Sequence, residues 1–164
     1  MDGSTGWREI LALTALKAQY CRYLDTKRWD EWRALFTDGF VSDTSAAGGQ
    51  IITGADDFVA YIRGTLGDGK VTVHQVHNPE IDLTSATTAT GVWALHDVVH
   101  LGPGLDLHGY GHYHETYQKH GDAWRIATST LTRVREDIRT PLVSVRMTAR
   151  LRDAGAALAR RRGR

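Results

Sequence analysis

The 164-residue sequence predicts a single α+β domain in which three helices come first and a sheet of long, mainly antiparallel strands follows. Two observations predict this class. Through the first 66 residues, apolar side chains recur every three or four positions, as they do on the buried face of a helix. From residue 71 to about residue 135 the chain is instead rich in Val, Thr, Trp and Tyr, and only short turns interrupt it.

The first predicted helix carries an apolar stripe that faces a core. The stripe has helical spacing and consists of Trp7, Ile10, Leu13, Leu16, Tyr20 and Leu24. A corner at residues 25–27 then leads into a short second helix over residues 29–36, which has its own apolar positions at similar spacing. The two helices are therefore expected to meet near Asp25.

A brief strand is predicted over residues 40–43, and the glycine-containing segment 45–49 is expected to be a loop. The third helix is predicted to follow Gly54, because Asp56 and Asp57 suit a helix N-terminus. Its buried face consists of Phe58, Tyr61, Ile62 and Leu66. Gly67 stands just beyond its end.

Four long strands are predicted over residues 71–83, 88–101, 107–119 and 124–135. Short turns such as Gly102-Pro103-Gly104 join neighbouring strands in the antiparallel sense. The helices are then expected to pack on one face of a strongly curved sheet. A long, bent sheet closed by helices encloses a cone.

We assign residues 1–140 to this domain and residues 141–164 to a basic C-terminal helix or tail. A helix is predicted from Met147, and residues 160–164 are expected to be frayed or disordered because they have no apolar partner. Residues 133–164 carry ten arginines against three acids, so the first 132 residues hold a net charge of −6 within the total of +1. The tail lacks interleaved aromatic residues, and we expect no nucleic-acid binding.

Cys21 is the only cysteine, so the sequence predicts no internal disulfide. It contains neither a secretory leader pattern nor an apolar stretch long enough to span a membrane. We expect a cytoplasmic protein without membrane association. An exposed sheet face rich in Val and Trp would be a liability in a monomer, and it predicts a homo-oligomer, either a dimer or a trimer.

Three polar clusters interrupt the apolar pattern, at residues 20–29, 74–80 and 93–97. An acid, an imidazole and a phenol in apolar segments are costly to bury unless they satisfy one another. Such groups gather in active sites. The sequence therefore predicts an enzyme pocket.

The order of elements and these three clusters, together with the segment 109–126, resemble the SnoaL-like branch of the NTF2-like superfamily. This branch includes polyketide cyclases, scytalone dehydratase and bile acid dehydratases, and the resemblance covers roughly residues 8–136. It implies an NTF2-like cone. It also implies a cofactor-independent lyase or isomerase, a dehydratase or cyclase, that acts on a hydrophobic polyketide- or steroid-like carbonyl compound.

In the dehydratases of this family, a tyrosine and an aspartate of the first helix point into the cone. A histidine of the second strand and an acid or histidine of the third strand join them. The matching residues here are Tyr20, Asp25, His74 and Asp97. Leu24 departs from scytalone dehydratase, which has a tyrosine directly before the aspartate, and Asp97 is more similar to the bile acid dehydratase pattern.

These four residues suggest general acid-base chemistry. His74 is expected to take a proton from the carbon next to a carbonyl and to return it to a leaving hydroxyl. Asp97 could hold one imidazole nitrogen, so that the two residues act as a dyad. Tyr20 could donate a hydrogen bond to the enolate-like oxygen. Asp25 could position a water, the tyrosine or a substrate hydroxyl.

Each assignment has a purely structural alternative. The tyrosine could be a core residue with a satisfied hydroxyl, and Asp25 could cap or brace the corner between the helices. His74 could be a sheet histidine bonded to the backbone. Asp97 could be the buried partner of Arg125 or Arg133.

Trp93, Leu95 and Val99 share a strand face with Asp97, so they are expected either to line an apolar substrate pocket or to be plain core. The next strand adds two further candidates for substrate contact, His112 and Tyr113. Side chains alternate along a strand, so either the histidines or the tyrosine of this segment can face the cavity, but not all three.

His112 and His114 could share a metal ion across one strand position. Their spacing is similar to the cupin motif, which would want glycine at position 106 and glutamate at 118 or 119. This chain has Asp106, Gln118 and Lys119 there. We therefore expect no bound metal, and no glycine-rich phosphate loop predicts a nucleotide cofactor.

Two other functions stay open at this point. An epoxide or ester hydrolase would use Asp25 or Asp97 to activate a water molecule. Alternatively, the cone could be a non-catalytic module that binds a small ligand or supports assembly, because a fold does not fix a function.

Overall fold

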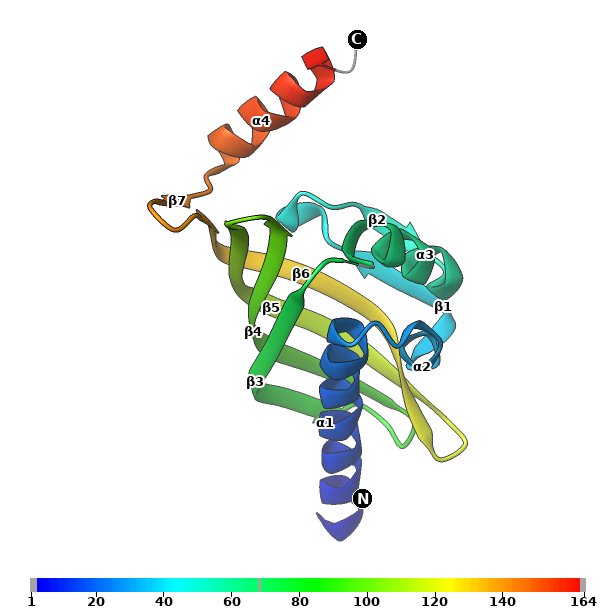
Figure 1. The fold of residues 1–164 in the computed structure, drawn as a ribbon. Coiled ribbons are helices and arrows are strands. Elements are labelled where there is room, and N and C mark those ends of the chain that lie inside the picture. Colours follow the sequence, from blue (N-terminus) through cyan, green and yellow to red (C-terminus); the bar gives the residue numbers. More distant parts are fainter. Residues whose placement is uncertain (1–2, 68, 163–164) are drawn as a thin grey trace.

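The structure, a computed structural model, describes residues 3–67 and 69–162, and in these residues the N-terminal helices pack against one curved seven-stranded sheet (Figure 1). The helices are α1 (Gly3–Asp25), α2 (Trp29–Arg33), α3 (Ala55–Leu66) and α4 (Ala149–Arg162), with a 3₁₀ turn at Ser45–Ala47. The strands are β1 (Phe36–Asp43), β2 (Ile51–Thr53), β3 (Thr72–Leu83), β4 (Thr88–Gly102), β5 (Leu105–His120), β6 (Ala123–Arg139) and β7 (Ser144–Arg146). The α+β class is confirmed.

The strands lie in the order β2-β1-β6-β5-β4-β3, and β7 pairs with the far end of β6. The run from β3 to β6 is the predicted antiparallel meander. β1 was expected as a brief strand, but it begins at Phe36 and pairs in parallel with β6. This pairing brings the N-terminal part of the chain into the sheet beside its last long strand.

α1 packs its apolar stripe against the inner face of the sheet, as the spacing predicted. Leu13, Leu16, Tyr20 and Leu24 are all buried. Trp7, at the start of the predicted stripe, is exposed instead. The core is therefore organised around the C-terminal half of this helix, which ends at Asp25 beside β3.

An aromatic cluster joins the three N-terminal helices to β1. The rings of Phe36 and Phe40 lie 4.4 Å apart, and both contact Phe58 of α3. Trp32 of α2 packs edge-on against Phe36 at 5.0 Å. α2 stops at Arg33, shorter than predicted, because Phe36 already pairs with Ile126 in the sheet.

A β-bulge in β6 changes which side chains reach the inner face. Tyr110 of β5 pairs with Arg135, but the next residue, Gly111, pairs with Arg133, so Val134 is extra. An extra residue reverses the alternation of faces beyond it. As a result, Arg133 and Glu136 both line the inner cavity, although residues with this spacing would face opposite sides of a regular strand.

The C-terminal segment leaves the body of the domain as α4 (Figure 1). Arg152 of α4 donates hydrogen bonds to Glu136 and, at 3.0 Å, to the carbonyl of Ala46. The helix continues to Arg162, and the last two residues of the segment predicted to fray, 163 and 164, lie outside the described residues. None of the helices within residues 3–67 and 69–162 is long and apolar enough to cross a membrane.

Candidate active site

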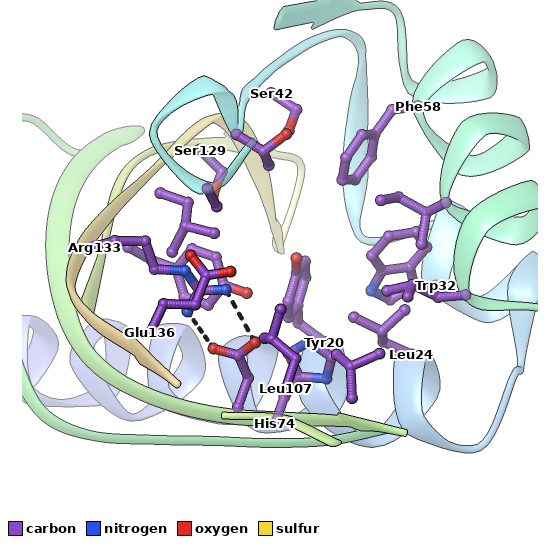
Figure 2. Close-up of a pocket in the computed structure, with 18 of the residues that line it drawn as sticks. Tyr20, Leu24, Trp32, Ser42, Phe58, His74, Leu107, Ser129, Arg133 and Glu136 are labelled. Carbon is purple, nitrogen blue, oxygen red and sulfur yellow. Dashed lines mark hydrogen bonds and ion pairs between the residues drawn. The ribbon is translucent and has the colours of Figure 1, made fainter. Parts of the chain in front are cut away.

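A cavity of about 240 Å³ lies between the N-terminal helices and the inner face of the sheet (Figure 2). Its walls are mainly apolar, with contributions from Leu24, Trp32, Phe58, Ile62, Leu107 and Leu131. A few polar side chains interrupt these walls. Apolar walls with few polar anchors are typical of small-molecule sites.

His74 lines this cavity and is held by Asp25. Asp25 Oδ1 accepts a hydrogen bond from His74 Nδ1 at 2.7 Å and another from Thr72 Oγ1 at 2.9 Å. Asp25 Oδ2 accepts the backbone N–H of His74 at 2.8 Å. The last residue of α1 thus braces the start of β3 and fixes the orientation of the imidazole.

This contact also sets the tautomer of His74. An ionised carboxylate only accepts hydrogen bonds, so Nδ1 must carry the proton that it donates to Asp25. Nε2 of the neutral ring is then an acceptor. Histidines that act in acid-base catalysis are commonly held in this way: a carboxylate orients the ring through one nitrogen, and the other nitrogen takes and returns the proton.

Asp97 does not make the predicted contact with His74. Both of its oxygens instead accept hydrogen bonds from the guanidinium of Arg133, one of them at 3.0 Å from Nη2. Burial alone would lower the pKa of Arg133, but the hydrogen bonds and charge of Asp97 outweigh it and raise this pKa. Asp97 is therefore the buried partner of Arg133, which was the structural alternative for this residue. Asp25, not Asp97, is the carboxylate that contacts the imidazole of His74.

Gly109 makes room for this ion pair. It is the residue of β5 opposite Asp97, and a Cβ atom at this position would lie 2.2 Å from Arg133 Nη1 and 2.5 Å from Asp97 Oδ1. Neither distance is possible for a real side chain. The charged pair therefore occupies the volume that a side chain of β5 would otherwise fill.

Tyr20 and Tyr113 also contribute polar groups to the wall. Their rings lie 5.8 Å apart, nearly perpendicular to each other, and both line the cavity. Burial raises the pKa of each phenol well above its ordinary value. Both hydroxyls therefore stay protonated and can donate hydrogen bonds.

A buried ion pair beneath these phenols was missed at the sequence level. Lys17 Nζ lies 2.6 Å from Glu115 Oε1, and both side chains are fully buried. The same ammonium lies 4.0 Å from the ring centre of Tyr20 and 3.7 Å from that of Tyr113. The sequence held a signal, because Lys17 falls on the apolar stripe of α1 and Glu115 alternates with Tyr113.

The other predicted substrate contacts divide into three groups. Val99 and Tyr113 line the cavity. Trp93 and Leu95 are buried core residues that do not line it, and the indole of Trp93 instead donates a hydrogen bond to Tyr117 at 2.7 Å. His112 lies on the opposite, outer face of the sheet, so the expectation that it contacts a substrate in this cavity is wrong.

His112 and His114 are neighbours on that outer face, with ring centres 6.3 Å apart. Among the described residues, no group of three His, Cys, Asp or Glu side chains is arranged to hold a metal ion. The absence of a bound metal or cofactor stays a prediction.

Four polar lining residues were not singled out from the sequence: Ser42, Thr44, Ser129 and Glu136. Ser42 and Ser129 are direct neighbours in the parallel pairing of β1 with β6. Parallel pairing of these strands has no local sequence signal. Glu136 reaches the cavity only because of the bulge at Val134.

The cone, its apolar cavity and the oriented imidazole of His74 define a small-molecule site, and the comparisons identify the protein as an enzyme of the lyase or isomerase type. A family model described as a SnoaL-like domain matches residues 7–130, and the chain belongs to this family. The protein named probable cyclase FGR4, from Gibberella zeae, is 27% identical over 132 residues, which cover 72% of this chain and 86% of the cyclase.

Solved structures share the fold. A candidate scytalone dehydratase from Novosphingobium aromaticivorans has a TM-score of 0.72 and 24% identity, covering 81% of this chain and 89% of that one. The hexachlorocyclohexane dehydrochlorinase LinA-type3 from Novosphingobium barchaimii has a TM-score of 0.67 and 13% identity, covering 88% and 94%. These likenesses confirm the predicted NTF2-like cone.

Proposed function

We propose that this enzyme removes a proton next to the carbonyl of a small hydrophobic ring compound and then eliminates or cyclises the resulting enolate. The observation that carries the proposal is the bond between Asp25 and His74 Nδ1, which leaves Nε2 of a cavity-lining imidazole free to accept a proton. The resemblance of the chain to a protein named as a cyclase supports the same class of chemistry.

In the first step, His74 Nε2 takes the proton from the α-carbon, and the electron pair of the broken C–H bond forms the double bond of an enolate. Asp25 stabilises the imidazolium that results, because the carboxylate lies within hydrogen-bond distance of its other nitrogen. The negative charge moves to the carbonyl oxygen. Tyr20, a protonated phenol in the cavity wall, donates a hydrogen bond to this oxygen.

In a dehydration, the enolate electrons then re-form the carbonyl, a new double bond forms between the α- and β-carbons, and the β-hydroxyl leaves. The imidazolium of His74 returns its proton to this leaving group, so the products are water and an unsaturated ketone. In a cyclisation, the enolate carbon instead attacks a second carbonyl of the same molecule. One histidine serves as base and then as acid in either case.

The size of the cavity favours a small substrate. Its volume of about 240 Å³ is below the roughly 300–1,000 Å³ that is typical of pockets for drug-sized ligands. We therefore propose a carbonyl compound with two or three fused rings of polyketide type, rather than a four-ring steroid-like one.

The contacts of the two carboxylates favour this chemistry over epoxide or ester hydrolysis. A hydrolase would need a carboxylate with a free oxygen to activate water. Asp97 is engaged by Arg133 through both oxygens, and Asp25 accepts three hydrogen bonds from β3. His74 is thus the better base.

Proton abstraction can be tested without knowing the natural substrate. 1-Tetralone is incubated with the protein in deuterium oxide, and deuterium incorporation next to its carbonyl is followed by mass spectrometry. Incorporation by the wild type that is lost in His74→Ala supports the proposal. In parallel, 3-hydroxy-1-indanone, a β-hydroxy ketone, reports loss of water.

His77→Ala is the matched control, because His77 is an exposed histidine of the same strand. This variant is expected to exchange deuterium like the wild type. Equal exchange by His74→Ala and the wild type would contradict the proposed role of His74. Binding of 1-tetralone without any exchange would favour a non-catalytic receptor, and exchange without water loss would favour an isomerase or cyclase.

A further inference from the structure

The cavity has a second polar end that the proposed chemistry does not use. Figure 2 shows Ser42 and Ser129 at the end opposite His74 and Leu107. The two serines are paired residues on neighbouring strands, and both are buried. A hydroxyl away from water is costly unless it has a hydrogen-bond partner.

The buried ion pair of Lys17 and Glu115 fixes the orientation of one of these hydroxyls. Ser129 Oγ donates its proton to Glu115 Oε1 at 3.1 Å, and the same oxygen of Glu115 accepts from Lys17 Nζ at 2.6 Å. The proton of Ser129 is therefore committed, and its oxygen can only accept a hydrogen bond from the cavity side. Glu136, a further acceptor, lines the same cavity.

We infer that this end is a subsite for a hydroxyl group that the substrate carries far from its reacting carbonyl. The substrate hydroxyl donates to Ser129 Oγ, and Ser42 Oγ, which can both donate and accept, pairs with the same group. The inference rests on the proposed function, because it places the carbonyl at Tyr20 and His74. It narrows the substrate class to hydroxylated ketones with two or three fused rings.

The probes are 1-tetralone and 6-hydroxy-1-tetralone, which differ only in a hydroxyl at the far side of the second ring. Isothermal titration calorimetry gives the dissociation constant of each ketone for the full-length protein. One net hydrogen bond predicts that the wild type binds the hydroxylated ketone roughly three- to tenfold more tightly. In Ser129→Ala and in Ser42→Ala this ratio is expected to fall toward one.

Thr130→Ala is the matched control, because this residue follows Ser129 on β6 and borders a shallow pocket on the outer face. It is expected to keep the wild-type ratio. Equal binding of the two ketones by the wild type, or an unchanged ratio in both serine variants, would overturn the hydroxyl subsite alone. If the wild type binds neither ketone, the proposed carbonyl site fails as well.

Discussion

His74 and Asp97 lie directly opposite each other on β3 and β4, yet the side chain of each bonds a residue from elsewhere in the chain. His74 turns toward α1 and bonds Asp25. Asp97 turns toward β6 and bonds Arg133. Paired positions in one ladder thus separate the proposed acid-base pair from a structural ion pair.

The role of Asp25 can be tested by Asp25→Asn. The side chain keeps its shape but loses its charge, and its amide can present a donor to Nδ1, which would move the proton of the imidazole to Nε2. Deuterium exchange into 1-tetralone is expected to slow by about 10²- to 10⁴-fold, the usual effect of removing general acid-base catalysis. An unchanged circular dichroism spectrum would show that the fold is retained, and wild-type exchange rates would contradict this role.

Asp97→Ala is expected to act mainly on stability. It leaves Arg133 buried without a partner, which typically costs about 3–5 kcal/mol of unfolding free energy. Replacing both residues by apolar ones, as in Asp97→Leu with Arg133→Met, should recover much of this loss. Urea denaturation measures the free energy of unfolding of both variants. If Asp97→Ala abolished deuterium exchange at wild-type stability, Asp97 would have to be assigned a catalytic role instead.

Lys17→Met tests the ion pair beneath the two phenols. The variant leaves the Glu115 carboxylate fully buried without its cation, and a loss of about 3–5 kcal/mol in unfolding free energy is expected. Adding Glu115→Gln removes the charge but keeps an acceptor for Ser129, so the double variant should be more stable than Lys17→Met. Additive losses in this double-mutant cycle would argue against direct coupling of the pair.

The free energy of unfolding is expected to fall as the pH rises above about 9. Burial raises the pKa of the Cys21 thiol from its ordinary value of 9.0 to about 11. The unfolded chain then releases this proton at a lower pH than the folded one, so ionisation favours unfolding across this range. The stabilisation is complete below pH 9 and is lost as the pH passes 11.

The matched variant for this pH dependence is Cys21→Ala. Urea unfolding of this variant, measured between about pH 9 and pH 11, should show a shallower loss of stability than the wild type. The buried phenols Tyr20 and Tyr113, whose pKa values are also raised, keep a remaining slope at the alkaline end. Identical slopes in the variant and the wild type would contradict the assignment to Cys21.

Most of the fold could be predicted from the sequence because its elements have strong local signals. The stripe of α1 and the long meander from β3 to β6 follow from periodicity and turn residues. The short strands β2 and β7 and the parallel pairing of β1 with β6 were missed. These features depend on contacts between distant segments, which leave no repeating pattern in the sequence.

The candidate site could be predicted only in part for the same reason. His74, Tyr20 and Tyr113 reach the cavity, but no spacing indicated that Asp25 rather than Asp97 would meet the imidazole. That choice depends on where α1 ends relative to β3. The division of the chain at residue 140 also stays a prediction, although β7, which follows that residue, pairs with β6. The homo-oligomer and the cytoplasmic location stay predictions too.

Because Gly109 has no side chain, Asp97 and Arg133 can meet beside it, so these three positions depend on one another. A methyl group there would occupy the space of the Asp97 and Arg133 charges, so Gly109→Ala should be damaging in the wild type. The same change should be milder where both charged residues have been replaced by smaller apolar ones. A redesign that places a side chain at this position of β5 would therefore have to change Asp97 and Arg133 together with Gly109.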